Sequence, residues 1–330
     1  MIINREKFAA ADITFSTFFN KVFTAMRERL AIGPLTLEVA SSTRQEMYVW
    51  ANAFPKFIEW VSDAQFSRMS AYGYAIENKY FQGGLEVLRE DIEDDNLNVV
   101  RPQIANLAEE AAFHEEDLIF SLMVNGFTNL KGLAYDGQFF YDTDHQDIGG
   151  GPIQSNKATY KLSQNSLQTA ITMMRSLKDV NGRYLRIEPT DIYVSPSNEW
   201  LARQLVYQDY ILVGAVLQPN PLKGIVKVNV WNRLASVPDA WFLFDQSKEG
   251  IKPFVHQTRE PMQFVAQDRP EDDNNFMRRI LRWSAFCRDN AGYGMWQSAW
   301  ASDGSTAPLL AEAEKGPAPQ PPATPSKAAA

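Results

Sequence analysis

GYAIENKYFQGGLEVLRED at residues 73–91 and IEDDN at residues 92–96 lead into a helical pattern that runs from about Pro102 to Phe127. Side chains in the first segment alternate between two faces, which is typical of an extended strand. The run contains no catalytic motif. It predicts a long arm followed by a long strut, as expected of a subunit that holds other subunits.

The glycine pair Gly83-Gly84 in this stretch has two local interpretations. Two such residues between two alternating runs form a hairpin signal. The same pair also fits a bulge or bend inside one long strand. The local sequence leaves both interpretations open.

The helical pattern predicts an unusually long amphipathic helix. Pro102 fits its first turn, and Gly126 fits its C-terminal cap. Its repeating apolar positions are Ile104, Leu107, Ala108, Ala111, Leu118, Ile119, Leu122 and Met123. About 25 residues at roughly 1.5 Å each give a rod on the order of 37 Å long. The acidic residues Glu93, Asp94 and Asp95 ahead of it fit a helix cap more simply than a cation site.

The rest of the chain predicts a mixture of helices and strands. Amphipathic patterns mark helices at about residues 12–30 and 164–179. A strand, a turn and a helix follow at residues 188–206, and residues 253–300 are mostly extended. Buried-type strands are expected at residues 226–234 and 239–246. This order is typical of an α+β chain whose last strands rejoin the first core.

Composition narrows the class of protein. With 330 residues and 45% hydrophobic side chains, the chain buries one large core or two moderate ones. A formal net charge of −8 argues against a dedicated nucleic-acid-binding surface, which is usually basic. The single cysteine, Cys287, excludes an intrachain disulfide. The sequence has neither the apolar region of a signal peptide nor an apolar run long enough to span a membrane, so we expect a cytosolic protein. The Pro/Ala-rich end of the chain is expected to be a flexible tail.

The chain carries few residues that are suited to catalysis. It has three histidines and none of the common nucleotide-binding, hydrolase or metalloprotease motifs. Asp142-Thr143-Asp144-His145 is the best metal candidate, because carboxylate and imidazole ligands fall within four residues. A turn with local side-chain bonds to the backbone explains it more simply. Cys287 fits a small core residue better than a nucleophile. We therefore predict no catalytic residue, cofactor or metal.

One contrast of charge points to a contact. Arg278, Arg279, Arg282 and Arg288 gather on a late strand, whereas residues 86–117 hold eleven acidic residues and two basic ones. A solvated strand edge explains such arginines, since sheet edges often carry positive charge. The alternative hypothesis pairs them with the acidic segment, within one subunit or across an interface.

Seven blocks of the sequence point to a family. In order they are SSTRQEMYVW, AFPKFIEWV, YGYAIENKYF, LREDIEDDNL, FSLMVNGF, YDGQFFYDTDH and RDNAGYGMWQ. Spread from about Ser41 to Ala299, they resemble the major capsid proteins, or major head subunits, of Mu-like phages and prophages. Two positions depart from the expected pattern: glutamine instead of proline follows His145, and no cysteine precedes Tyr135.

The resemblance implies the Hong Kong 97-type capsid fold, an α+β fold with a spine helix in a peripheral domain and an inserted axial domain. Carried onto this sequence, its parts are an N-terminal arm (1–40), an extended loop (41–90), a peripheral domain (91–185) with a spine helix at about 100–127, an axial domain (186–250), returning strands (251–300) and a flexible tail (301–330). Under this interpretation Gly83-Gly84 is a bend within one limb of the loop and not a hairpin tip.

The implied function is structural. Copies of the chain would form pentamers and hexamers of an icosahedral shell around double-stranded DNA, first in the host cytoplasm and then in the virion. Scaffold, portal and decoration proteins are the further partners, and no membrane is involved. Residues expected at contacts between subunits are Trp50, Phe54, Phe57, Trp60, Lys79, Arg278 and Arg282. Some relatives of this fold join subunits through an isopeptide bond, for which Lys79 lies in the right loop.

Two other functions remain as alternatives. An encapsulin-like compartment has the same type of fold but encloses enzymes. A metal-dependent enzyme would be centred on Asp142, Asp144 and His145.

Overall fold

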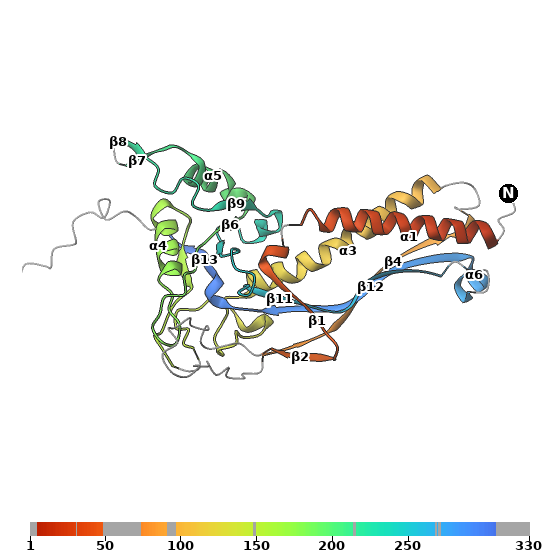
Figure 1. Cartoon of the computed structure of the whole chain (residues 1–330). Helices are drawn as coiled ribbons and strands as arrows, with labels where there is room; N and C mark the ends of the chain where they lie inside the picture. Colours follow the sequence, from red (N-terminus) through yellow and green to blue (C-terminus); the bar gives the residue numbers. More distant parts are fainter. Residues whose placement is uncertain are drawn as a thin grey trace, which may run out of the picture.

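Two long helices and two long strands lie side by side and form an arm that extends from a more compact part of the molecule (Figure 1). The helices are α1 (Arg5–Arg27) and α3 (Leu97–Asn125), and the strands are β11 (Phe254–Gln267) and β12 (Ile280–Tyr293). This computed structural model describes residues 5–30, 32–48, 74–90, 97–147, 150–213, 216–267, 269 and 272–307. No helix within these ranges is long and apolar enough to cross a membrane.

The sheet of the arm brings together strands from both ends of the sequence. Its order is β1–β11–β12–β4, with β1 at Thr36–Ala40 and β4 at Lys79–Leu88. β1 is parallel to β11, and the other neighbours are antiparallel. Along most of β12, buried residues alternate with half-buried ones, because one face of the sheet packs against the helices. The late strands therefore rejoin the early ones, as the sequence predicts.

The glycine pair lies inside one continuous strand. Gly83 and Gly84 of β4 stand opposite Ala285 and Ser284 of β12, in a register without a shift. The hairpin interpretation is therefore wrong, and no bulge occurs at this point. A Cβ atom on Gly83 would lie 3.1 Å from Cδ1 of Leu107, so the missing side chain lets α3 lie close to the strand.

The long helix begins earlier than the pattern predicts. α3 spans 29 residues, and Gly126 follows its end. Pro102 therefore lies inside the helix and not in its first turn, which corrects the sequence prediction. Burial accounts for the extra turn, because Val100 lies in the same buried cluster as Ile104. Tertiary packing of this kind supplies most of the stability of a helix in a protein.

Aromatic residues attach α1 to the arm sheet. Phe15 packs edge-on against Trp283 with ring centroids 5.5 Å apart, and Phe19 stacks on Phe264 at 4.6 Å. Both phenylalanines are buried in one cluster with apolar residues of α3. Such ring pairs contribute about 0.5–1.5 kcal/mol beyond the area that they bury. The arm is thus one layer of helices on one sheet.

A five-stranded sheet forms the centre of the compact part. Its order is β5 (Lys157–Tyr160), β13 (Ala299–Thr306), β10 (Trp241–Phe244), β6 (Asp191–Val194) and β9 (Lys227–Val230). All residues of β6 and β10 are buried. The sequence correctly predicts strands at β9 and β10. β13 continues past residue 301, where the flexible tail was expected to start, and residues 308–330 lie outside the described part.

Two helices pack near this sheet, and a hairpin projects from the compact part beyond α5 (Figure 1). They are α4 (Gln164–Arg175), α5 (Glu199–Tyr207) and the hairpin of β7 (Tyr210–Val213) and β8 (Val216–Pro219). Helices were expected at both α4 and α5, and the structure confirms them. A short helix, α6 (Asp273–Arg278), lies at the far end of the arm, in a region predicted to be mostly extended.

One hydrophobic cluster joins the arm to the compact part. Tyr293 at the end of β12 stacks on Phe140 with centroids 4.6 Å apart, and Phe140 lies 5.5 Å from Phe254 at the start of β11. Met123 of α3 and Phe242 of β10 belong to the same buried cluster. The two parts therefore share a core.

A small sheet of β2 (Gln45–Tyr48) and β3 (Tyr74–Glu77) crosses the end of β12. The backbone N–H of Tyr293 donates a hydrogen bond to Tyr74 Oη over 2.8 Å. Gly292 permits this approach, because a Cβ atom there would lie 2.6 Å from Tyr74 Oη and 2.7 Å from Ile76 Cδ1.

Gly292→Ala is expected to destabilise the protein by about 1–3 kcal/mol, the usual cost of overpacking a tight contact. Gly250→Ala is the matched control, because no atom lies within 4 Å of the Cβ atom that it adds. Urea unfolding of the unassembled subunit, followed by tryptophan fluorescence, measures both variants. Equal free energies of unfolding for the two would contradict the close crossing of β3 over β12.

Candidate functional site

A buried polar network holds together the two ends of the segment expected to form the extended loop. The amide of Gln257, on β11, donates to Asn78 Oδ1 over 2.7 Å and accepts from Tyr48 Oη over 2.7 Å. Asn78 Nδ2 in turn donates to Ser41 Oγ over 2.9 Å. A buried polar group left without its partner costs about 1–3 kcal/mol. The network therefore fixes where this segment leaves and rejoins the sheet.

The residues predicted to make contacts from this segment are only partly described. Trp50, Phe54, Phe57 and Trp60 lie outside the described residues. Lys79 is exposed at the start of β4, which is the outer strand of the arm sheet. An outer strand leaves backbone N–H and C=O groups free on one side. A contact of Lys79 with another subunit stays a prediction.

Two of the late arginines pair with the acidic segment of the same chain. Arg282 Nη2 lies 2.8 Å from Glu86 Oε2, and Arg279 Nη1 lies 3.4 Å from Glu90 Oε1. All four side chains are well exposed to solvent, and pairs of this kind contribute about 0–1 kcal/mol. These pairs therefore add little to the stability of the fold. The pair of Arg282 with Glu86 does link neighbouring positions of β12 and β4.

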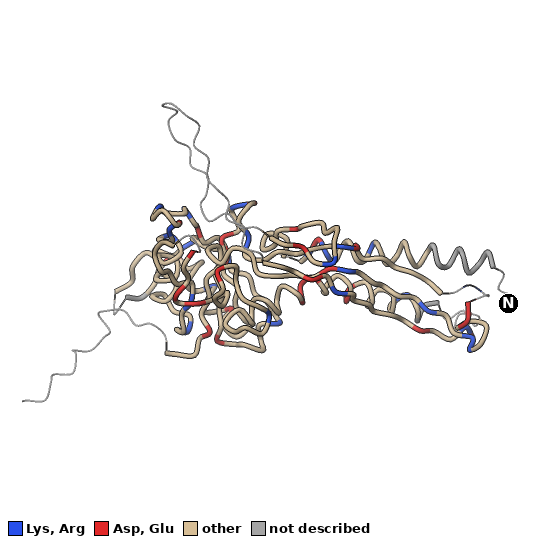
Figure 2. Tube along the Cα trace, turned by 90° about the horizontal axis from the view of Figure 1, so that it is seen from below, with Lys and Arg blue, Asp and Glu red and all other residues tan. Residues whose placement is uncertain are grey.

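The other two arginines differ from this pattern. Arg288 Nη1 lies 3.8 Å from Glu260 Oε1, and its guanidinium lies 4.6 Å from the centre of the Tyr80 ring. Arg278, at the end of α6, is exposed and makes no ion pair within the described part of the chain. Figure 2 shows that basic and acidic positions are interspersed along the molecule rather than separated onto two faces. A contact of Arg278 with another subunit stays a prediction.

Two groups of exposed apolar side chains belong to elements that lie at opposite ends of the molecule in Figure 1. The distal group, near α6, consists of Leu88, Val265, Phe276 and Met277. The hairpin group, on α5 and β7–β8, consists of Trp200, Leu201, Tyr207, Tyr210, Val216 and Leu217. Phe276 is 78% exposed and Trp200 is 76% exposed. Covering side chains of this size with another surface lowers the free energy, because apolar area is removed from water.

The sequence analysis did not single out either group. The signal for the hairpin group lies in α5, where Ala202, Leu205 and Val206 are buried while Trp200 and Leu201 face outward. A helix that is apolar on more than one face needs a second surface to cover it. The sequence alone does not show which apolar residues of α5 are buried, so it does not show that Trp200 and Leu201 are the exposed ones.

The metal candidate at residues 142–145 does not form a site. His145 is buried, with Nδ1 2.6 Å from Asp136 Oδ2 and Nε2 3.1 Å from Asn156 Oδ1. The Asp142 carboxylate accepts the N–H of the next residue over 2.8 Å, as the turn interpretation expects, and Asp144 is exposed. A metal-dependent enzyme centred on these three residues therefore has no geometric support.

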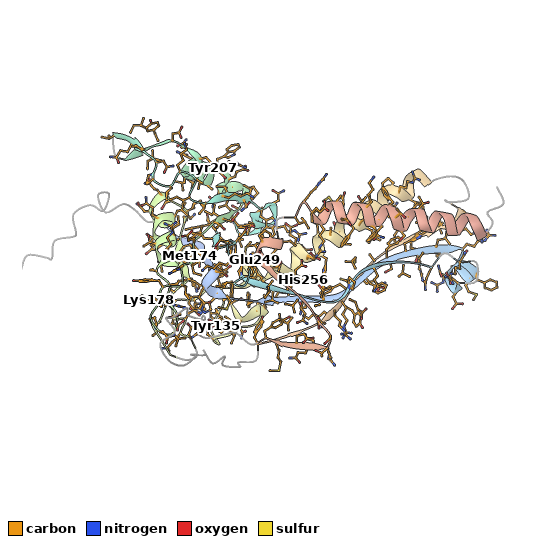
Figure 3. All side chains as sticks on the ribbon, viewed as in Figure 1. Tyr135, Met174, Lys178, Tyr207, Glu249 and His256 are labelled. Carbon is orange, nitrogen blue, oxygen red and sulfur yellow. The ribbon has the colours of Figure 1, made fainter. Side chains whose placement is uncertain are left out.

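A buried polar cluster that the sequence analysis missed lies where the arm meets the compact part. Asp289 stands between two histidines: Oδ1 is 2.9 Å from His114 Nε2, and Oδ2 is 3.1 Å from His256 Nε2. Cys287 Sγ lies 3.7 Å from the same Oδ1. Cys287 is buried, as expected of a core residue. Figure 3 places His256 at this junction.

Burial and hydrogen bonding set the charges in this cluster. Burial alone would raise the pKa of Asp289, but the hydrogen bonds from His114 and His256 outweigh it and lower the pKa to about 2. Burial is the largest single effect on His256 and would lower its pKa, but the hydrogen bond to Asp289 and the negative charges of Glu115, Asp289 and Glu38 together raise it. Burial raises the pKa of the Cys287 thiol to about 12, with Asp289 adding to the effect. Asp289 is therefore ionised at neutral pH, and the thiol is protonated.

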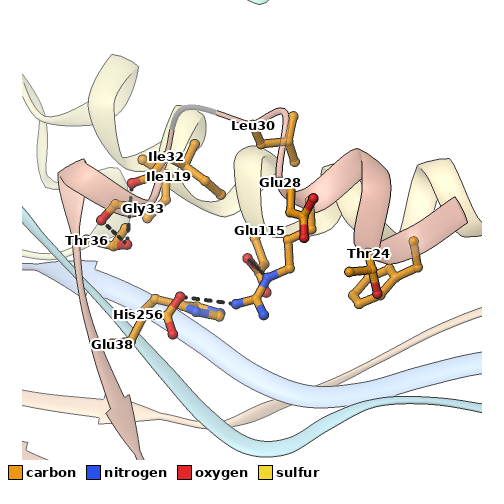
Figure 4. Close-up of a pocket in the computed structure, with 12 residues that line it drawn as sticks. Thr24, Glu28, Leu30, Ile32, Gly33, Thr36, Glu38, Glu115, Ile119 and His256 are labelled. Carbon is orange, nitrogen blue, oxygen red and sulfur yellow. Dashed lines mark hydrogen bonds and ion pairs between the residues drawn. The ribbon is translucent and has the colours of Figure 1, made fainter. Parts of the chain in front are cut away.

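Arg27, the last residue of α1, joins three elements beside this cluster. Its Nε lies 3.0 Å from Glu115 Oε2 of α3, and its Nη2 lies 3.1 Å from Glu38 Oε1 of β1 (Figure 4). A cavity of about 390 Å³ lies against these residues and His256. The end of α1 is thus held by polar contacts, in addition to the aromatic contacts along its length.

Comparison with known sequences points to one family. The chain matches the profile of the Mu-like prophage major head subunit gpT over residues 8–160, 153–234 and 226–313. The major capsid protein of Escherichia phage Mu is 30% identical over 270 residues, which make up 82% of this chain and 65% of that protein. The FluMu prophage major head subunit of Haemophilus influenzae is 27% identical over 267 residues, 81% of this chain and 64% of that protein. The chain thus spans less than two thirds of the length of either relative.

Solved capsid structures share the fold. The procapsid of bacteriophage JBD30 has a TM-score of 0.53 at 24% identity and covers 92% of this chain and 77% of its own. The mature capsid of bacteriophage PhiM1 has a TM-score of 0.50 at 10% identity, and covers 85% of this chain and 87% of its own. These likenesses establish the Hong Kong 97-type α+β capsid fold. Together with the profile match, they show that this chain belongs to the family of Mu-like prophage major head subunits.

Proposed function

We propose that this chain assembles with itself into pentamers and hexamers, which close into an icosahedral shell around double-stranded phage DNA. The observation that carries the proposal is the presence of exposed apolar groups at opposite ends of an elongated subunit of this family. Clusters of exposed apolar side chains mark interaction surfaces in soluble proteins. Neighbouring copies in a shell would cover both groups.

The placement of the two groups suits a ring. A contact between two different surfaces of the same chain is heterologous, and such contacts form closed rings when the rotation between copies closes. Each apolar Å² removed from water contributes roughly 25 cal/mol. Contacts repeated around rings, and again between rings, hold a shell without covalent bonds.

The extended loop at residues 41–90 would supply further contacts. We infer that Trp50, Phe54, Phe57 and Trp60 pack on adjacent subunits. The anchored ends of this segment support the inference, because a loop with fixed ends is less costly to order on binding. Lys79 lies beside this anchor and belongs to the same proposed contact surface.

The division of the chain into parts follows from the same proposal. The N-terminal arm (1–40), the spine helix of the peripheral domain (91–185) and most of the returning strands (251–300) would form the elongated arm, while β5 and α4 of the peripheral domain belong to the compact part. The axial domain (186–250) would contribute α5 and the β7–β8 hairpin. The hairpin group would then line the contacts around each ring axis.

The shell would enclose DNA without sequence-specific binding. The net charge of −8 and the interspersed charges in Figure 2 support this, because tight phosphate binding needs a basic surface. Scaffold, portal and decoration proteins would be the other partners, in the host cytoplasm during assembly and then in the virion. The role is structural and not enzymatic. An encapsulin-like compartment would contain enzymes instead, so the content of purified particles separates the two functions.

Electron microscopy of the purified protein, combined with size-exclusion chromatography, tests self-assembly. We expect rings of five and six subunits or closed shells, formed by the protein alone or after addition of a scaffold protein. A chain that stays monomeric under both conditions would contradict the proposed function.

Serine substitutions at Trp200 and Phe276 are expected to abolish assembly while leaving the fold intact. Both side chains are exposed, so each change should alter the free energy of unfolding by less than about 0.5 kcal/mol. Leu130→Ser is the matched control, because Leu130 is 74% exposed but belongs to neither group. Light scattering measures assembly, and urea unfolding measures stability. Normal assembly of the Trp200 and Phe276 variants would rule out both groups as contacts.

Charge reversal separates contacts inside the subunit from contacts between subunits. Arg282→Glu should lose its pair with Glu86, and the double variant with Glu86→Arg should restore both stability and assembly. Arg278→Glu should lower assembly without changing the urea midpoint, because the described chain offers it no ion pair. If Arg278→Glu assembles like the wild type, Arg278 is a solvated edge residue.

A further inference from the structure

The only cysteine and two of the three histidines of this chain meet at one buried position. Cys287 and Asp289 are two residues apart on β12, so their side chains lie on the same face of the sheet, the face that α3 covers. His114 reaches this position from α3, and His256 reaches it from β11. Thiol, imidazole and carboxylate groups are the ligands that zinc takes in proteins.

The spacing of three of these groups fits a single ion. His114, Cys287 and Asp289 each offer one ligand atom, and these atoms lie within 4.8 Å of one another. His114 Nε2 is 2.9 Å from Asp289 Oδ1, and Cys287 Sγ is 3.7 Å from the same oxygen. In a tetrahedral site with bonds of about 2.0–2.3 Å, neighbouring ligand atoms are roughly 3.3–3.8 Å apart. Small side-chain shifts therefore suffice to place an ion among them.

His256 occupies the position of an orienting residue. Its Nε2 lies 3.1 Å from Asp289 Oδ2, the carboxylate oxygen that faces away from His114. A hydrogen bond to the second oxygen of a ligating carboxylate fixes its orientation, and loss of such a partner typically lowers metal affinity 10–100-fold. His256 does not need to touch the ion.

Charge balance and access also favour a bound ion. A dication is neutralised by the Asp289 carboxylate and a Cys287 thiolate, so no net charge is buried. A cavity of about 420 Å³ is lined by His114, Cys287 and Asp289, and a second cavity, of about 230 Å³, borders His114 and Cys287. These cavities give an ion an entrance and leave room for water as a fourth ligand.

We propose that His114, Cys287 and Asp289 bind one zinc-class divalent ion, which ties the spine helix α3 to strand β12. On binding, the S–H bond of Cys287 breaks, a sulfur–metal bond forms, and the proton passes to solvent. His114 moves its proton from Nε2 to Nδ1, so that the Nε2 lone pair coordinates the ion. The bound ion replaces the hydrogen bonds that join the same residues in its absence.

Titration of the full-length, chelator-stripped protein with Zn²⁺ tests the proposal by calorimetry. We expect one ion per chain and the release of about one proton, read from titrations in buffers of different ionisation enthalpy. Titration with Co²⁺ should add a sulfur-to-cobalt charge-transfer absorption. Failure to bind, or binding without the cobalt–sulfur absorption, would show that the cluster is a hydrogen-bonded network only.

Variants locate the ion. Cys287→Ser should lower the affinity at least 100-fold and remove the cobalt–sulfur absorption, and His256→Asn should lower the affinity 10–100-fold but keep that absorption. Asp144→Asn, at an exposed carboxylate outside the cluster, should leave both unchanged. Thermal unfolding of each stripped variant shows whether it is folded. Wild-type affinity in the folded Cys287→Ser variant would overturn the proposal, whether or not the protein forms shells.

Discussion

The structure depends on the packing of α3 and α1 against one face of the two long strands β11 and β12. Phe15 and Phe19 of α1 lie against Trp283 and Phe264 of these strands, and buried residues of α3 complete the same cluster. The arm consists of one layer of helices and one sheet with a single core between them, so it is only two layers thick. Its length follows from the 29 residues of α3 and the 14 residues of each strand. An elongated subunit is the result, with its two ends far apart.

The same strands connect the arm to everything else. Phe254 starts β11 and Tyr293 ends β12, and both belong to the core shared with the compact part. Gln257 of β11 holds the base of the segment that contains β2 and β3. His256 and Asp289 form the buried cluster between these positions. The segment base, the polar cluster and the compact part are thus positioned by a few residues of two neighbouring strands.

Helical periodicity predicts α3 because this helix buries one face along its length, and the mostly extended sequence at residues 253–300 predicts β11 and β12. Pro102 shows the limit of local signals: a proline usually marks a first turn, yet burial of Val100 extends the helix before it. Gly83 and Gly84 resemble a hairpin signal until β12 pairs with them. In both cases packing against a segment far away in the sequence decides the local structure. The local sequence does not contain that information.

The buried polar cluster and the exposed apolar groups were harder to predict than the fold. His114, His256 and Asp289 are far apart in the sequence, and no local pattern marks them as neighbours. Trp200 and Phe276 were also missed, since an apolar residue in a predicted helix, as at Trp200, or in a predicted strand, as at Phe276, is normally assigned to the core. The resemblance to capsid proteins pointed to the function, whereas the structure identified which apolar residues are exposed on the single subunit.

A high-resolution cryo-electron microscopy reconstruction of the assembled particle tests the central claim most directly. The account predicts that the hairpin group and the distal group are each buried against a neighbouring subunit, with Trp200 and Phe276 both removed from water. A shell in which both side chains remain exposed would contradict it.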